Sequence, residues 1–111
     1  MARRSNYAFN KSKLKRVDSP QKAFKQFLDI ARRNNISKFN EWLAFGYDVN
    51  MNNYGMTALH IAAYFRRETM IKMLLANGAS PFVVNDAGHT PADFVSDSAR
   101  LKNLFERHKQ P

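Results

Sequence analysis

Apolar side chains recur at helical spacing in the segment between residues 20 and 46. The first stripe follows the i, i+3, i+4, i+7 spacing of one helix face and consists of Phe24, Phe27, Leu28 and Ala31. Ser19 offers an N-cap in front of this stripe, and Pro20 occupies the first helical position. After the turn RRNN, a second stripe consists of Ile36, Phe39, Trp42 and Leu43. Gly46 ends this stripe as a C-terminal glycine, so the pattern predicts two consecutive helices.

The middle of the chain repeats this plan. We expect Thr57 to cap a helix that runs through Phe65, and ETMIKMLLA to form a second helix that ends at Gly78. The inner face of this second helix is expected to consist of Met70, Ile71, Leu74 and Leu75. WLAFG (42–46) aligns with LLANG (74–78) at a shift of 32 residues, and GMTAL (55–59) aligns with GHTPA (88–92) at 33. A nearly constant shift indicates an internal repeat.

This repeat resembles an ankyrin repeat, in which a β-turn finger precedes two antiparallel helices. The resemblance is carried by GMTALHIAA (55–63) and MIKMLLANGA (70–79), and GHTPADF (88–94) opens a further repeat. The helix pair at 20–46 resembles an N-terminal capping repeat without its finger. The resemblance implies an all-α, ankyrin-type helix-turn-helix solenoid of about two and a half to three repeats with short β-turn fingers. Its repeats are expected at approximately 18–50, 51–83 and 84–111.

Three features depart from the family pattern. Arg66 and Arg67 replace the Gly-His that usually links the two helices, and Glu68 replaces a usual leucine. Arg107 and His108 stand where apolar residues are usual late in the last helix. A polar outer face is what a terminal repeat needs for solubility, so this third departure fits a capping role.

The positive charge is concentrated at the start of the chain. The formal net charge is +9, whereas residues 39–111 contain seven residues of each sign. Residues 1–17 lack an amphipathic period, and we expect a flexible basic arm there. Its cations are Arg3, Arg4, Lys11, Lys13, Lys15 and Arg16. They are suited to nuclear import, to sequence-independent contacts with about six phosphates, or only to solubility.

Residue types that carry out catalysis or bind metal are scarce. The chain has no cysteine and only three histidines. It also lacks the G-x-S-x-G nucleophile motif, the P-loop and the G-x-G-x-x-G dinucleotide-binding motif. We interpret His60 as structural, because Thr57 is suited to cap the amide of His60. The family resemblance implies that this histidine also bonds to neighbouring turns. We therefore expect no enzyme, no catalytic residue, no metal site and no cofactor.

The resemblance implies protein binding through a concave surface formed by the finger tips and the first helix of each repeat. Carried over by position, the candidate partner-binding residues are Arg32, Arg33, Asn53, Tyr54, Met56, Tyr64, Phe65, Asp86, His89 and Asp97. Tyrosine, phenylalanine, methionine and arginine are common in interface hot spots. An alternative for Phe65 is inward packing against the Arg66-Arg67 turn. The order from arginines through aromatics to aspartates suggests a dipolar partner.

These observations predict a small adaptor or inhibitor that binds another protein inside a cell, in the cytoplasm or nucleus, or after delivery into a host cell. The alternative is a nucleic-acid-associated accessory protein that uses the basic arm. The longest apolar runs, such as IAAYF, are too short to span a bilayer, so we expect no membrane partner. Because a stack of so few repeats is marginally stable, we also consider a homodimer.

Overall fold

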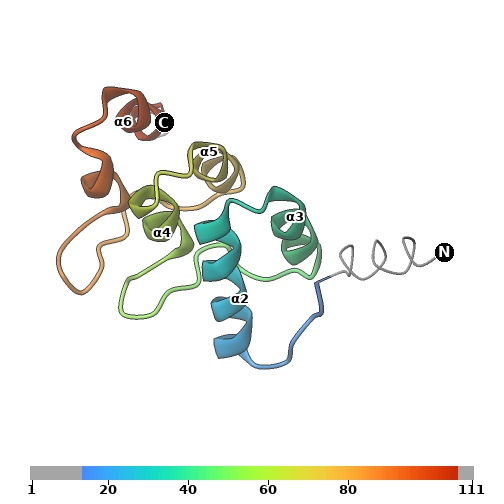
Figure 1. Ribbon diagram of the computed structural model, residues 1–111. Helices are drawn as coiled ribbons and strands as arrows, with labels where there is room; N and C mark the ends of the chain where they lie inside the picture. Colours follow the sequence, from blue (N-terminus) through green and yellow to red (C-terminus); the bar gives the residue numbers. More distant parts are fainter. Residues whose placement is uncertain (1–13, 108–111) are drawn as a thin grey trace.

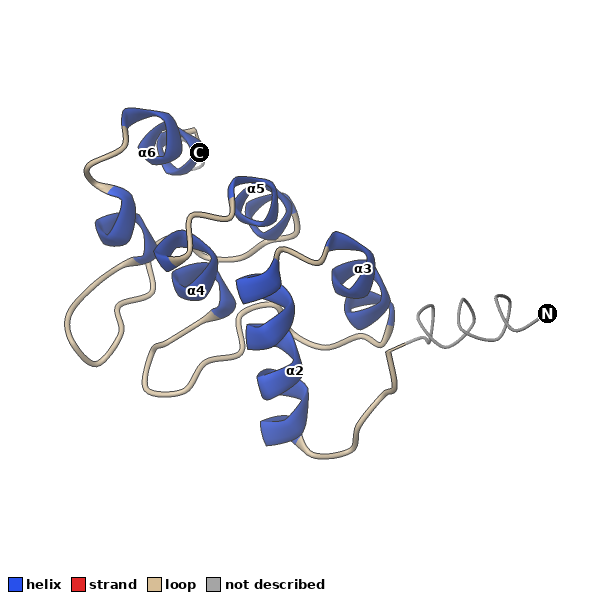
Figure 2. Ribbon diagram, in the orientation of Figure 1, coloured by secondary structure: helices blue, strands red, loops and turns tan. Residues whose placement is uncertain are grey.

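The computed structural model describes residues 14–107. The helices are α2 (Pro20–Arg33), α3 (Ile36–Ala44), α4 (Ala58–Tyr64), α5 (Glu68–Ala76), the 3-10 helix η1 (Pro91–Val95) and α6 (Ala99–Glu106). They alternate between two layers, with α2, α4 and η1 in one layer and α3, α5 and α6 in the other (Figure 1). Within this part of the chain, β-structure is limited to an isolated bridge between Asn53 and Met56, and loops join the helices (Figure 2). The expected all-α solenoid of helix pairs is confirmed.

The helix ends follow the capping signals of the sequence. The Ser19 side chain accepts a hydrogen bond from the amide of Lys22, with a proline at the first helical position of α2. Gly46 and Gly78 follow α3 and α5 with φ angles of 88° and 93°, a backbone conformation that favours glycine. Both predicted helix pairs are therefore confirmed.

The first helix of the last repeat is a 3-10 helix. Pro91–Val95 contains five residues, and Ser98 already caps α6 by accepting from the amide of Leu101. The interval between the cap at Thr90 and the cap at Ser98 leaves room for little more than one turn, which suits the short 3-10 form.

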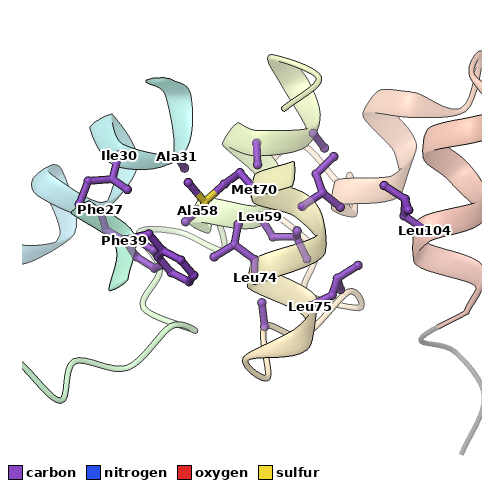
Figure 3. Close-up of a cluster of buried hydrophobic side chains, with 14 of the residues drawn as sticks. Phe27, Ile30, Ala31, Phe39, Ala58, Leu59, Met70, Leu74, Leu75 and Leu104 are labelled. Atoms are coloured by element: carbon purple, nitrogen blue, oxygen red, sulfur yellow. The ribbon is translucent and has the colours of Figure 1, made fainter. Parts of the chain in front are cut away.

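A continuous apolar core joins the two layers (Figure 3). In the first repeat, Phe27 stacks on Trp42 with ring centroids 3.8 Å apart, and the Trp42 indole nitrogen donates to the Ala23 carbonyl oxygen at 3.2 Å. Ala62 and Ala63 on α4 are fully buried, and their small side chains let neighbouring helices approach closely. As a result, α4 packs against both α2 and η1, so the middle repeat holds the two end repeats together.

Polar side chains also tie one repeat to the next. Asn50 donates from Nδ2 to the Gly78 carbonyl oxygen at 3.0 Å, and its Oδ1 accepts from the Ser80 amide at 2.8 Å. At the other end of the helices, Asn34 Oδ1 accepts from the Met70 amide at 3.1 Å. Each contact occupies a backbone group at a loop or helix end, which otherwise has no partner within its own repeat.

Residues 14–17 differ from the flexible arm that the sequence suggested. The Val17 amide donates to the Tyr47 hydroxyl oxygen at 3.0 Å, and this hydroxyl donates to the Val17 carbonyl oxygen at 2.8 Å. Arg16 donates to the Phe45 carbonyl oxygen at 2.6 Å, and its guanidinium lies 5.1 Å from the Tyr47 ring centroid. The Leu14 amide donates to Glu41. This segment is therefore fixed on the first helix pair.

Candidate functional site

The finger before α4 is a tight two-residue turn. Asn53 and Met56 exchange two backbone hydrogen bonds of 3.1 and 3.0 Å around Tyr54 and Gly55. Both central residues have positive φ angles, 53° and 81°, as in a type I′ turn. Asn-Gly and Asp-Gly are the preferred pairs in this turn, and a tyrosine in the left-handed region costs about 1–2 kcal/mol. Tyr54 is nevertheless 76% exposed, so burial of its ring does not offset that cost.

The second finger lies directly against the first. Its ends are closed by the Asn85 amide, which donates to the His89 carbonyl oxygen at 2.9 Å. A Cβ atom added to Gly55 would lie 2.2 Å from the Val84 carbonyl oxygen and 2.8 Å from Asn85 Cα. Glycine at position 55 therefore allows the two fingers to form one continuous edge.

His60 fixes the second finger to α4. Its Nδ1 accepts from the Thr57 amide at 3.1 Å, so the ring proton is on Nε2. Nε2 then donates to the His89 carbonyl oxygen at 2.9 Å. The ring is fully buried, and this burial lowers the pKa of His60 below its ordinary value, so the neutral form prevails. The expected structural role of His60 is confirmed.

An aromatic cluster, defined as Tyr64, Phe65, His89 and Phe94, lies where α4 meets η1 and the second finger. The Tyr64 ring meets Phe65 and Phe94 edge-on, with centroids 5.0 and 5.8 Å apart. His89 and Phe94 are 5.6 Å apart. Tyr64 is 63% exposed and Phe65 is 40% exposed, so Phe65 is partly packed inward and partly accessible to a partner. Phe94 was not among the residues predicted from sequence, although it lies 33 residues after Ile61 in the repeat register.

Three grooves follow the fingers and the first helices. The groove between α2 and the first finger is lined by Pro20, Gln21, Phe24, Lys25, Met51, Asn52 and Asn53. The α2/α4 groove is lined by Lys25, Leu28, Asp29, Arg32, Ile61 and Phe65. The groove between the finger tips is lined by Asn53, Tyr54, Met56, Asn85, Asp86 and Ala87. Lys25 and Asn53 each line two grooves, so the three are contiguous. We call this face, together with the aromatic cluster, the finger surface.

Six of the ten predicted partner-binding residues line these grooves, namely Arg32, Asn53, Tyr54, Met56, Phe65 and Asp86. Tyr64 and His89 belong to the adjoining aromatic cluster. Sequence reasoning missed the α2 residues Phe24, Lys25 and Leu28. The i, i+4, i+7 spacing of residues 25, 29 and 32 on α2 is the signal that would have placed Lys25 beside Arg32.

Ion pairs reduce the charge gradient expected along this surface. Asp29 Oδ1 accepts from both Arg32 and Arg33, at 2.7 and 2.9 Å. The hydrogen bond from Arg33 and that from Arg32 lower the pKa of Asp29. At the other end, Arg66 donates to Asp97 at 2.7 Å, and this bond lowers the pKa of Asp97. The carboxylate of Asp29 thus offsets part of the positive charge of Arg32 and Arg33. The guanidinium of Arg66 offsets the negative charge of Asp97.

Other kinds of site lack support in the described part of the chain. Among residues 14–107, no three His, Cys, Asp or Glu side chains gather in a way that could hold a metal ion. In the same range, no helix has both the length and the apolar character needed to cross a membrane.

Comparison with known proteins places residues 43–95 in the family of ankyrin repeats. The chain is 43% identical over 72 residues to an L-asparaginase of Dirofilaria immitis, covering 64% of this chain and 12% of that protein. It is 38% identical over 69 residues to a mitochondrial disaggregase of Homo sapiens, covering 61% of this chain and 10% of that protein.

A third relative is protein phosphatase 1 regulatory subunit 12A of Mus musculus, 39% identical over 66 residues, covering 59% of this chain and 6% of that protein. The chain thus spans only about an eighth or less of the length of these relatives. The family match and the stacked helix pairs with their fingers show that residues 43–95 belong to the ankyrin-repeat family.

Proposed function

We propose that this chain is a non-enzymatic adaptor or inhibitor that binds a partner protein through the finger surface. Ankyrin repeats generally mediate protein–protein interaction. The observation that carries the proposal is the contiguous set of grooves, bordered by the exposed rings of Tyr54 and Phe65. Exposed aromatic side chains beside shallow grooves are typical anchors of protein interfaces.

The conformation of Tyr54 supports the same proposal. Stability alone would favour asparagine or glycine at this turn position, because tyrosine is strained at a φ of 53°. A strained residue whose ring is mostly exposed makes no contribution to the core that offsets the strain. Strain of this kind is found at functional sites, and partner binding gives it a reason.

Nucleic-acid binding by the basic arm stays a prediction. Arg3, Arg4, Lys11 and Lys13 lie outside the described residues. Lys15 is exposed, whereas Arg16 is engaged with the Phe45 carbonyl oxygen and the Tyr47 ring. The described residues therefore favour the finger surface as the binding site. Homodimer formation and the cellular location also stay predictions.

The test is a nuclease-treated pull-down at low and moderate salt with the intact chain as bait. A double variant, Tyr54→Ala with Tyr64→Ala, removes two exposed rings of the finger surface. Phe82→Ala is the matched control, because Phe82 is 58% exposed in the loop after α5 and lines none of the three grooves. A third variant replaces Arg3, Arg4, Lys11 and Lys13 by glutamine.

We expect a protein partner that is captured at both salt concentrations, retained by Phe82→Ala and lost by the double tyrosine variant. If the Tyr54/Tyr64 double variant captures the partner as well as Phe82→Ala does, the finger surface is not the binding site. Capture that depends on the four basic residues, weakens with salt and disappears with nuclease would establish the nucleic-acid alternative instead.

A further inference from the structure

The α2/α4 groove combines an apolar floor with one charged wall, which α2 provides and whose net charge is positive. Leu28 from α2 and Ile61 from α4 are half-buried and packed on the core, and Phe65 forms one end of the groove. Lys25 and Arg32 project from the same face of α2, because residues seven apart lie two turns apart on a helix. Asp29 lies between these two cations in the sequence of α2 and lines the same groove. An apolar side chain placed on this floor would therefore lie along a wall with a cation two turns from the next.

The positive charge of this groove is not balanced within the described residues. The sequence of α2 contains four cationic residues and the single carboxylate Asp29, whereas α4 contains no Asp, Glu, Lys or Arg. Asp29 is shared by two arginines, and Lys25 has no ion pair within residues 14–107. Arg32 uses one nitrogen for Asp29 and retains other donors, since a guanidinium has five N–H groups.

We infer that the α2/α4 groove binds a short, extended segment of a partner protein in which an apolar residue lies between two acidic residues. This inference rests on the proposed function and names the chemistry of the partner. The apolar side chain would contact Leu28, Ile61 and Phe65, while the two carboxylates would lie beside Lys25 and Arg32.

The spacing of the two cations specifies the segment further. Seven residues of α-helix rise by about 10 Å. A chain in the extended polyproline II conformation covers about 9 Å in three residues and, with three residues per turn, places side chains three positions apart on the same side. The expected motif therefore has two Asp or Glu residues three positions apart, with Leu, Ile, Met or Phe at one of the two positions between them.

Other occupants fit this groove less well. Nucleic acid is recognised by clustered cations and stacking rings, whereas this groove has a largely aliphatic floor, two cations that are two helical turns apart and the carboxylate of Asp29, which would repel phosphates. A second copy of the chain would bring a formal charge of +9 toward an already positive surface. An acidic segment is attracted by the same charge.

The test selects random 12-residue peptides on phage against the immobilised full-length chain. Selected peptides are then synthesised with a fluorophore, and their affinity is measured by polarisation. Lys25→Glu reverses the charge at one end of the groove, and Phe65→Ala removes the apolar end. Lys102→Glu is the matched control, because it changes the net charge equally but lies exposed on α6, at the other end of the solenoid (Figure 1).

We expect selected peptides to share the acidic–apolar–acidic motif. Lys25→Glu and Phe65→Ala should each weaken their binding about tenfold or more, while Lys102→Glu should change it less than about twofold. Binding should also weaken as salt is raised, because the acidic contacts are partly exposed. Circular dichroism confirms that each variant is folded as the intact chain is.

The other outcomes overturn the inference and separate it from the proposed function. Peptides that are basic or uncharged, yet lose binding in the Tyr54/Tyr64 double variant, would leave the finger surface as a binding site but refute an acidic partner. Peptides insensitive to all of these variants would refute both proposals. Failure to select any peptide would refute a short linear segment, while the pull-down would still test binding of a folded partner.

Discussion

Replacement of Gly55 by alanine tests how closely the two fingers approach each other. The added methyl group would lie 2.2 Å from the Val84 carbonyl oxygen and 2.8 Å from Asn85 Cα, both backbone atoms. Gly88 offers a matched control in the second finger. Its φ angle of 86° is close to the 81° of Gly55, but a methyl group there would meet no atom within 4 Å.

The difference between the two variants isolates the steric contribution. Alanine in the left-handed region costs about 1–2 kcal/mol at either position. At position 55 the backbone must also move to relieve the clash, which adds about 1–3 kcal/mol. We therefore expect Gly88→Ala to lower the free energy of unfolding by about 1–2 kcal/mol and Gly55→Ala by about 2–5 kcal/mol. A domain of this size has only about 5–15 kcal/mol in total.

Urea denaturation followed by circular dichroism measures both values under the same conditions. The unfolded-state effect of replacing glycine by alanine is similar at the two positions and cancels in the comparison. If Gly55→Ala is no more destabilising than Gly88→Ala within about 0.5 kcal/mol, the fingers do not pack as described. The continuity of the finger surface would then lose its main support.

Three further predictions concern the same region. Because burial lowers the pKa of His60 in the folded chain, the unfolded chain binds the proton more tightly. The stability that depends on neutral His60 is therefore complete above its ordinary pKa of 6.5 and is lost as pH falls toward the lower folded value. Urea midpoints at pH 7.5 and 5 should differ more for the intact chain than for His60→Gln, and equal differences would contradict the argument. Arg66 has a φ angle of 57° and pairs with Asp97. Arg66→Gly and Arg66→Ala both lose this ion pair, but only glycine removes the strain of the positive φ angle. Arg66→Gly should therefore be about 1 kcal/mol more stable than Arg66→Ala. In thermal melts, equal midpoints for these two variants would show that position 66 is unstrained. Tyr54→Asn should raise the free energy of unfolding by about 0.5–1 kcal/mol and weaken partner capture. If this variant is more stable and still captures the partner fully, Tyr54 does not take part in binding.

Local signals in the sequence predicted much of the helical framework. Ser19 followed by Pro20 marked the start of α2, and Thr57 three residues before His60 marked the start of α4. These caps depend on atoms within one helical turn, so spacing alone identifies them. The repeat register then placed the fingers, because each finger immediately precedes a cap.

Long-range contacts explain what the sequence did not predict. Arg16 was expected in a flexible arm, but its partners are the Phe45 carbonyl oxygen and the Tyr47 ring, about 30 residues away. Lys25 becomes part of the candidate site only when α2 and α4 lie side by side. Composition and periodicity carry little information about such pairings between elements.

The hydrogen bonds that link successive repeats have a consequence for how the chain folds. They join Arg67 to Arg32, Met70 to Asn34, and His60 to His89, at sequence separations of 35, 36 and 29 residues. Each therefore requires the closure of a loop of about one repeat, for which the entropic cost is modest. Since the middle repeat takes part in all three, we expect folding to begin there and to spread toward both ends, at a rate set by these short loop closures.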